Sequence, residues 1–300
     1  MKLVADEFTS GIRIDTFLAS AIGEGSLSRS KIQSEIKKGA VLINNKQVKP
    51  SYLLKEGDVI EFEPSEDSKI LPENIPLNIV WEDENMLVVN KPSGMLTHPT
   101  TTEKSGTLVN ALLYKYGENL SDINGEYRRG ILHRLDRNTS GLLMIAKNNE
   151  AHEYLVNAMK AGKTEKKYLA VVKGIINEDE FTINKPIMRN PQQPHKMMTG
   201  EGGKESISIV KVLKRFNDAT FIEVQLITGR THQIRVHLSS INHPVYNDTL
   251  YGFGKMKIKT EEQVLESYKL SFPHPYVGEI LSFEITPDEK LEKVLKYLSS

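Results

Sequence analysis

A polar, proline-punctuated stretch divides the chain into a short first part and a long second part. Residues 64–69 are polar apart from Pro64, and Pro72 and Pro76 follow. Proline removes a backbone hydrogen-bond donor and fixes φ, so such a stretch favours an extended connection over a helix or an inner strand. We therefore predict a first domain at residues 1–63, a linker at 64–76 and a second domain at 77–300.

The composition permits a sizeable core and limits the kinds of site. The chain has 300 residues, of which 39% are hydrophobic, and this length is typical of two domains. It has no cysteine, which excludes disulfides, thiolate metal ligands and cysteine nucleophiles. No run of about 18 apolar residues is present. We expect a cytoplasmic protein without membrane contact, and a monomer.

Residues 1–63 have the pattern of two helices followed by a small sheet. Apolar residues recur with helical spacing over 14–22, and a second helix is predicted at 29–38. Ser28 is its expected cap, and Gly39 suits its left-handed end. A hairpin is expected at 41–48 with its turn at Asn44 and Asn45, and a further turn and strand at 54–62.

Strands and helices alternate irregularly in the second domain, which predicts an α+β fold with a mixed, mostly antiparallel sheet flanked by helices. Residues 189–205 lack periodicity and predict a mobile loop or a long hairpin tip. A last helix is expected with Thr286 as cap, Pro287 in its first position and Glu289 completing a capping box. The other predicted strands are 86–90, 142–146, 168–172, 207–213, 220–226 and 280–285, and the other predicted helices are 108–116, 150–160 and 231–239.

One carboxylate stands among arginines directly before an apolar segment. Asp136 lies between Arg134 and Arg137, and a polar turn through Gly141 leads to the apolar residues 142–146. Such a carboxylate can be a nucleophile, a general base or a metal ligand, or it can cap the turn that follows. This segment alone does not separate a catalytic role from a capping role.

The segment 131–141 resembles the catalytic motif of RluA-type RNA pseudouridine synthases, H-R-L-D-x-x-T-S-G, at every fixed position. Residues 226–238 are similar to a second signature of that family, L-x-T-G-R-x-H-Q-I-R-x-H. The resemblance implies an enzyme that isomerises uridine to pseudouridine within RNA. Shorter similar segments are 90–99, 166–174, 244–252, where Asn247 replaces a glycine, and 265–275, where Glu266 and Ser267 depart from the family pattern.

The resemblance also implies roles for single residues. Asp136 would be catalytic, attacking the ribose anomeric carbon or the uracil ring, or assisting formation of a glycal. Arg230 would form an ion pair with Asp136 and keep it ionised. Tyr168 and Leu270 would pack on the two faces of the uracil, although both residue types are common in cores. Arg134 would fill the space left when the uridine is flipped out of its stack.

The first domain resembles the alpha-L RNA-binding domain, whose second helix and following turn present cations to RNA phosphates. An ordinary solvated helix face is the alternative for these charges. The 39 basic and 39 acidic residues give a net charge of zero, so RNA binding requires cations grouped on particular faces. The matching cations are Arg29, Lys31, Lys37, Lys38 and Lys46.

The expected partner is RNA, with large-subunit ribosomal RNA first and transfer RNA second. No nucleotide-binding loop motif is present, and His232 and His237 do not share a helix face, so we expect no cofactor and no metal. Two other functions stay open. An RNA-binding or chaperone module would not need Asp136, and a nucleoside or glycoside hydrolase would need a second carboxylate close to it.

Overall fold

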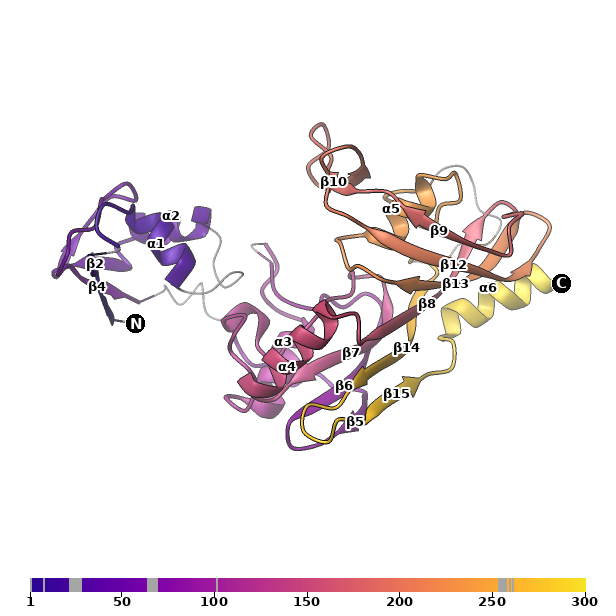
Figure 1. The fold of residues 1–300 in the computed structure, drawn as a ribbon, viewed down its shortest axis with the longest axis horizontal. Coiled ribbons are helices and arrows are strands. Elements are labelled where there is room, and N and C mark those ends of the chain that lie inside the picture. Colours follow the sequence, from indigo (N-terminus) through magenta and orange to yellow (C-terminus); the bar gives the residue numbers. More distant parts are fainter. Residues whose placement is uncertain are drawn as a thin grey trace. The chain divides into compact units, whose positions relative to one another are not determined.

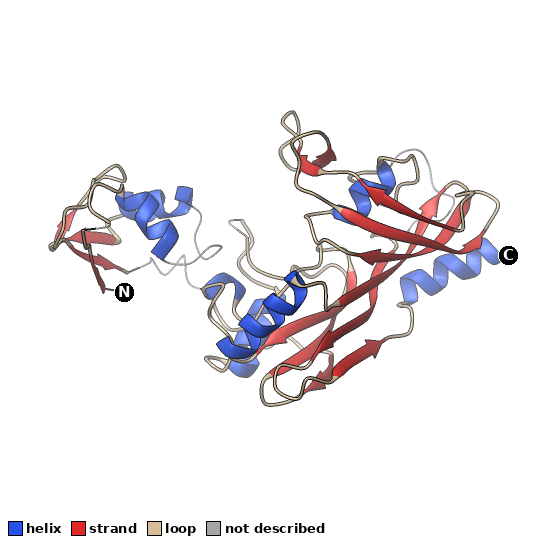
Figure 2. Ribbon diagram, in the orientation of Figure 1, coloured by secondary structure: helices blue, strands red, loops and turns tan. Residues whose placement is uncertain are grey.

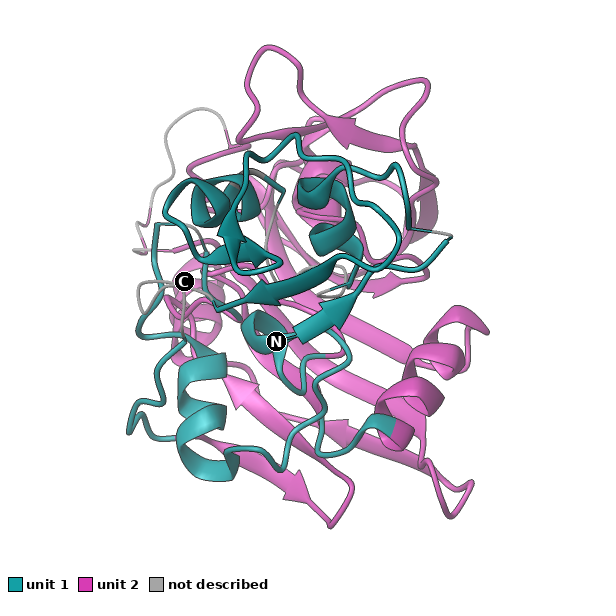
Figure 3. Ribbon diagram, turned by 90° about the vertical axis from the view of Figure 1, so that its left-hand side faces the viewer, with its two compact units in different colours: residues 1–76, 98–131, 146–149 teal, residues 77–97, 132–145, 150–300 magenta. Residues whose placement is uncertain are grey.

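The computed structural model describes residues 2–7, 9–21, 29–63, 70–100, 102–252, 258, 260 and 262–300. It divides into two compact units, shown in Figure 3: residues 1–76, 98–131 and 146–149, and residues 77–97, 132–145 and 150–300. The predicted domain boundaries stay predictions. Residues 64–69 of the predicted linker and Ser28, the predicted cap, lie outside the described residues.

The N-terminal part of the first unit has the predicted two helices and small sheet. The strand order is β1-β4-β2-β3, and all neighbours are antiparallel. Asn44 and Asn45 have φ values of 50° and 62°, as a two-residue hairpin turn requires. The elements are α1 (Ile14–Ala21), α2 (Arg29–Lys37), β1 (Lys2–Val4), β2 (Val41–Ile43), β3 (Lys46–Gln47) and β4 (Val59–Phe62).

Elsewhere in the first unit, α3 (Leu108–Tyr116) lies where it was predicted. Thr107 and Asn110 form a capping box at its start, which satisfies backbone donors that a helix leaves unpaired. A short 3₁₀ helix follows at Glu126–Arg128.

The second unit contains a nine-stranded mixed sheet, which confirms the predicted α+β architecture (Figures 1 and 2). The strand order is β5-β6-β7-β14-β8-β13-β12-β9, and β15 pairs with β14. β14 pairs in parallel with β7 and antiparallel with β8. The strands are β5 (Ile79–Glu82), β6 (Met86–Lys91), β7 (Ser140–Ala146), β8 (Glu165–Lys173), β9 (Glu180–Asn184), β12 (Ile207–Arg215), β13 (Ala219–Leu226), β14 (Leu265–Pro273) and β15 (Ile280–Glu284).

The helices α4 (Asn149–Lys160), α5 (Gln233–Ser239) and α6 (Glu289–Ser299) complete this part of the chain. The predicted cap of α6 is wrong, because Asp288 rather than Thr286 accepts a hydrogen bond from the Leu291 N–H, at 2.8 Å. The helix begins beyond Pro287, where a carboxylate reaches the free N–H groups of the first turn. In the described part of the chain, no helix is both long and apolar enough to cross a membrane.

The segment predicted as a loop or hairpin tip contains a short hairpin. β10 (Ile187–Arg189) pairs antiparallel with β11 (Met197–Thr199) as a separate two-stranded sheet. The helix α5 lies beside β11. It begins two residues later than predicted, because His232 has a left-handed φ of 57° that a helix does not accommodate.

Candidate active site

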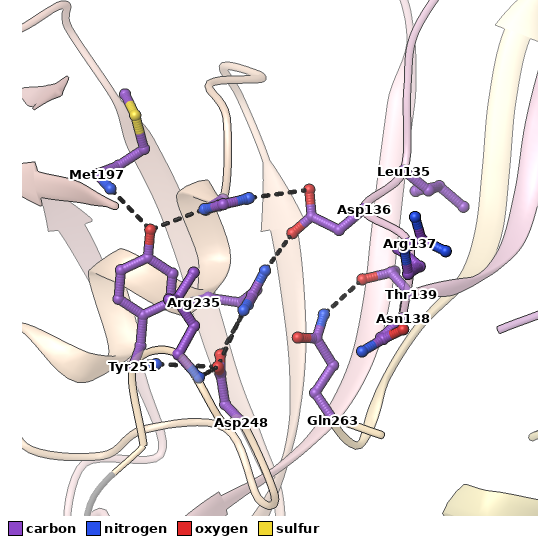
Figure 4. A network of polar contacts seen from close by, with 12 residues as sticks. Leu135, Asp136, Arg137, Asn138, Thr139, Met197, Arg235, Asp248, Tyr251 and Gln263 are labelled. Carbon is purple, nitrogen blue, oxygen red and sulfur yellow. Dashed lines mark hydrogen bonds and ion pairs between the residues drawn. The ribbon is translucent and has the colours of Figure 1, made fainter. Parts of the chain in front are cut away.

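The loop that carries Asp136 leads directly into β7 and is fixed on both sides of the carboxylate. Thr97 is buried, and its Oγ1 donates to the Leu135 carbonyl at 2.8 Å and accepts from the Leu135 N–H at 3.2 Å. On the other side, Gln263 Nε2 donates to Thr139 Oγ1 at 2.8 Å. Figure 4 shows the Asp136 carboxylate pointing away from Leu135 and Thr139 and toward Arg235.

A buried lysine also holds the loop. Lys91 has no exposed surface, and its Nζ donates to the carbonyls of Pro92, Met95 and Arg137 at 2.7, 2.8 and 3.1 Å. Burial lowers the pKa of Lys91 to about 7. Three carbonyl acceptors are what a buried ammonium requires, so Lys91 joins the segment 91–95 to the loop. Residues 90–99, one of the segments similar to the family, thus help to shape the site.

A close approach of two strands sets the base of the site. Gly141 of β7 lies opposite Ser267 of β14 and has a φ of 114°. A Cβ at Gly141 would lie 2.2 Å from the Ser267 carbonyl oxygen, so only glycine fits there. Ser267, which departs from the family pattern, donates from Oγ to the Leu142 carbonyl at 3.2 Å. The contact places β14 directly beside the loop that holds Asp136.

The ion-pair partner of Asp136 is Arg235. Its Nη1 donates to Asp136 Oδ2 at 2.9 Å. The same guanidinium donates from Nε and Nη2 to Asp248 Oδ2 and Oδ1, at 2.7 and 3.0 Å. Burial alone would lower the pKa of Arg235, but hydrogen bonds and charge from Asp248 and Asp136 raise it above its usual value. Asp248 therefore fixes the arginine that meets Asp136 (Figure 4).

The predicted ion pair between Arg230 and Asp136 is wrong. Arg230 Nε donates instead to the Glu205 carbonyl at 3.0 Å, and its N–H donates to Gln233 Oε1 at 2.9 Å. Arg230 lies in the turn before α5, whereas Arg235 lies on the buried face of that helix. The sequence contained a signal for this arrangement, because Arg235 stands directly between the apolar residues Ile234 and Val236 of a predicted helix.

Asp136 faces two connected spaces. A narrow pocket of about 50 Å³ and a wider cavity of about 490 Å³ are both lined by Arg134, Asp136, Tyr168 and Arg230. The structure thus brings together four of the residues predicted for the site. Burial raises the pKa of the Tyr168 hydroxyl, which keeps it protonated. Arg134 is exposed at this site.

Leu270, predicted to pack on the base, is fully buried and lines neither space. Leu265 of the same strand lines the narrow pocket together with Tyr168. Because the register of β14 shifts between Ser267 and Lys269, Leu270 lies opposite Lys166, whereas Ser267 lies opposite Tyr168. Spacing along the sequence does not reveal such a shift.

A histidine lies beside the second oxygen of Asp136. His232 Nε2 is 3.9 Å from Asp136 Oδ1, and His232 Nδ1 is 2.7 Å from the Tyr251 hydroxyl. The Tyr251 oxygen accepts from the Met197 N–H at 2.8 Å, so its own proton can go to Nδ1. Burial lowers the pKa of His232, which favours the neutral ring with its proton on Nε2, toward Asp136.

The predicted RNA-binding cations of the first domain differ in their surroundings. Arg29 pairs with the buried Asp15 at 3.2 Å, and its side chain is 51% exposed. Lys31 and Lys38 pair with the buried Glu35 at 3.2 and 3.8 Å. Lys37 and Lys46 are exposed. Ion pairs with buried carboxylates thus give three of the five cations a structural role as well.

Comparison with known proteins identifies the families to which the two parts of the chain are similar. Residues 85–240 match the RNA pseudouridylate synthase family, and residues 12–60 match the S4 domain. An uncharacterized RNA pseudouridine synthase of Aquifex aeolicus is 43% identical over 95% of this chain and 93% of its own length. One of Bacillus subtilis is 42% identical over 99% of this chain and 98% of its own. Ribosomal large subunit pseudouridine synthase D of Neisseria meningitidis serogroup B is 40% identical over 92% and 75%.

Solved structures show the same fold. Human RNA pseudouridylate synthase domain containing 1 superposes with a TM-score of 0.57 at 25% identity, covering 76% of this chain and 96% of that chain. Human RNA pseudouridylate synthase domain containing 4 gives a TM-score of 0.59 at 20% identity, covering 74% and 93%, and supports the fold. The chain therefore belongs to the RNA pseudouridine synthase family: it is an isomerase of uridine in RNA that carries an N-terminal S4 domain.

Proposed function

We propose that this protein isomerises specific uridines in large-subunit ribosomal RNA, with transfer RNA as the second candidate substrate. The names of relatives support the ribosomal substrate, since a pseudouridine synthase of the large ribosomal subunit is 40% identical over 92% of this chain. The S4 domain supports binding to structured RNA. A ribosomal RNA substrate would also place the protein in the cytoplasm.

The observation that carries the catalytic assignment is the unequal bonding of the two Asp136 oxygens. Oδ2 accepts from Arg235, while Oδ1 accepts no hydrogen bond from any described residue. The open oxygen would meet the nucleotide in the cavity. Attack on the ribose, attack on the uracil ring and assistance to glycal formation all require an ionised carboxylate at this place.

The reaction needs a captive base. The bond between N1 and the ribose C1′ breaks, the uracil turns, C5 joins C1′, and the proton that C5 loses is balanced by one gained at N1. Tyr168 and Leu265 line the narrow pocket and would hold the uracil, with Leu226 beside them. An apolar wall also keeps water from the ribosyl intermediate.

A hydrolase is disfavoured by the same geometry. Among the described residues that line the two spaces, Asp136 is the single carboxylate. The nearby Asp248 is fully engaged, since its oxygens accept from Arg235 and from the N–H groups of Leu250 and Tyr251. The second carboxylate that a glycosidase needs is therefore not available among the described residues that line these spaces.

The assignment is tested by mapping pseudouridines in ribosomal and transfer RNA from cells that lack the protein. Either the wild-type protein or the Asp136→Asn variant is then expressed in these cells. We expect specific pseudouridines of large-subunit RNA to return with the wild type alone. Sites that return only in transfer RNA would replace the ribosomal assignment, and sites that return with Asp136→Asn would overturn the role of Asp136. Release of free uracil by the purified protein would indicate hydrolysis.

We also propose that Arg134 fills the stack when the target uridine is flipped out, a step that costs a few kcal/mol. This proposal is supported by the position of Arg134, which is exposed and lines both spaces beside Asp136. Arg134→Ala should slow modification of a folded stem–loop far more than it weakens binding. Equal losses on a flexible single-stranded RNA would contradict this role.

A further inference from the structure

A second cavity, of about 510 Å³, adjoins the wide catalytic cavity. Both are lined by Gly229, Arg230 and Thr231, so the turn before α5 forms their shared rim. The other walls of the second cavity come from the β10–β11 hairpin and residues 202–204. Neither Asp136 nor Tyr168 lines it, so it lies outside the site of reaction.

The register of the hairpin points two cations into this cavity. Ile187 forms an antiparallel bridge with Lys204, through backbone hydrogen bonds of 2.8 and 2.9 Å, and Arg189 lies opposite Met197. Residues directly opposed across strands share a face, and so do residues two apart on one strand. Lys204 and Arg189 therefore project from the same face as Ile187 and Met197, and all four line the cavity.

The position of Lys204 depends on its neighbour Gly203. A Cβ at Gly203 would lie 2.8 Å from the backbone of Ile187. Glycine thus allows this segment to lie directly against β10. The backbone of Lys204 is fixed on both sides of the bridge, which aims its side chain at the cavity.

The charged side chains that line the cavity are all positive. Its charged lining residues are Arg189, Lys204 and Arg230, and no aspartate or glutamate of the described part of the chain lines it. Within the described ranges none of the three forms an ion pair. Arg230 is tethered through Nε to the Glu205 carbonyl, and Arg189 donates from Nη1 to the Pro194 carbonyl. Carbonyl tethers fix the guanidinium groups but leave their charge to be met by an anion.

We propose that this cavity is a subsite for the phosphodiester of a nucleotide adjacent to the target uridine in the RNA. The shared rim connects it to the place where the uridine reacts, so the inference rests on the proposed role of Asp136. Guanidinium groups bind phosphate through paired hydrogen bonds, and an ammonium adds a point charge. Contacts of this kind position the RNA chain without selecting its sequence.

The test uses the full chain with the inactive Asp136→Asn background, so that binding is measured without turnover. A double variant, Arg189→Gln with Lys204→Gln, is compared with Lys293→Gln plus Lys296→Gln, which removes the same charge from the exposed face of α6. The probe is a stem–loop RNA from the large subunit. We expect the first pair to bind about tenfold more weakly and its salt dependence to lose a slope of about 2. The control pair should match the parent.

A second measurement separates binding from chemistry. In the otherwise wild-type chain, the rate of pseudouridine formation at saturating RNA should stay within about twofold for the double variant. Arg189→Lys with Lys204→Arg should restore the salt slope, because charge is retained. An unchanged slope in the Gln variants, or a lower rate at saturation with unchanged binding, would overturn the subsite.

Failure of the ribosomal assignment is distinguishable from failure of the subsite. If the wild type forms no pseudouridine in the ribosomal stem–loop, the substrate proposal fails. The salt slopes of binding to the same RNA still decide the subsite, because phosphate contacts do not depend on sequence.

Discussion

Two aspartates of this chain lie against arginines, and their surroundings differ. The Asp15 side chain in α1 has no exposed surface, and Arg13, Arg29 and Gln33 all donate to its two oxygens. The Asp136 side chain is 17% exposed, accepts from one arginine and keeps Oδ1 open toward a cavity. A saturated carboxylate can only hold structure, whereas an ionised one with an open oxygen can react.

The comparison also explains part of the RNA-binding prediction. The hydrogen bond from Arg13 holds the pKa of Asp15 well below its usual range, ahead of the contrary effect of burial. Arg29 shares that carboxylate, so it joins α1 to α2. A cation that matches the S4 pattern can therefore have a structural role. The exposed Lys37 and Lys46 are the better candidates for phosphate contacts.

Replacing the open carboxylate should have the largest effect. Asp136→Asn should slow pseudouridine formation in single turnover by about 10⁴-fold or more, as loss of an essential carboxylate does in other enzymes. The fold should be retained, because Asp248 still holds Arg235. Rate and thermal unfolding are measured on the same preparation. A rate within tenfold of that of the wild type would indicate that Asp136 is not catalytic and only caps the turn.

Replacing each of the two candidate arginines by lysine tests which of them pairs with Asp136. Arg235→Lys loses the fork that joins Asp248 to Asp136, and we expect the single-turnover rate to fall by about 10²–10³-fold. Arg230→Lys keeps its charge and touches no carboxylate among the described residues, so we expect a change within about fivefold. The reverse order of effects would restore the pairing expected from sequence.

Replacing the saturated carboxylate should lower stability and leave the reaction rate unchanged. Asp15→Asn leaves the half-exposed Arg13 and Arg29 without their charge partner, and losing a hydrogen bond to a charged group costs about 1.5–3 kcal/mol. We expect a lower unfolding temperature and weaker RNA binding from a loosened first domain. The rate at saturating RNA should stay unchanged, and a lowered rate would contradict the contrast between Asp15 and Asp136.

The sequence predicted those parts of the fold whose signals are local, and it missed those that depend on contacts between distant residues. The helices of the first domain and the Asn44–Asn45 turn were predictable, because their signals lie within a few residues. The strand β14 was not predicted as a strand, since its partners β7 and β8 are distant in sequence and its register shifts within it. Local patterns encode local geometry, and long-range pairing decides the rest.

The site shows the same limit. The resemblance predicted Asp136, Tyr168, Arg134 and Arg230 at one site, and the structure brings these four together, but Arg235 was not predicted there. Which arginine meets the carboxylate depends on where α5 begins, and the left-handed φ of His232 sets that beginning. Motif spacing therefore identified the cluster but not the direction of each side chain within it.

A third carboxylate extends the comparison, because Glu266 is buried and pairs with no arginine among the described residues. One of its oxygens accepts from the Asp288 N–H at 2.9 Å, and burial raises its pKa to about 7 from 4.5. Between these values the folded protein keeps a proton that the unfolded chain has lost. The contribution of Glu266 to the free energy of unfolding is therefore fully present below about pH 4.5. It decreases by on the order of 2–3 kcal/mol as the pH rises toward 7.

Glu266→Gln keeps the shape of this side chain and removes its proton. We expect its unfolding free energy, measured by denaturant titration, to change less between pH 5 and pH 7.5 than that of the wild type. Parallel curves for the two proteins would show that another group controls this range of pH.

The smallest effect should come from the surroundings of the open oxygen. Tyr251→Phe removes the hydroxyl that joins Met197 and His232 but keeps the ring that lies 5.0 Å from the Arg235 guanidinium. Losing one net hydrogen bond corresponds to about 1 kcal/mol, so we expect a fall of about fivefold in the single-turnover rate with unchanged binding. His232 would lose the donor to Nδ1, and its ring could turn away from Oδ1. A rate equal to the wild type would show that Arg235 alone positions Asp136, whereas a fall beyond 10²-fold would make the histidine a second essential partner of the carboxylate.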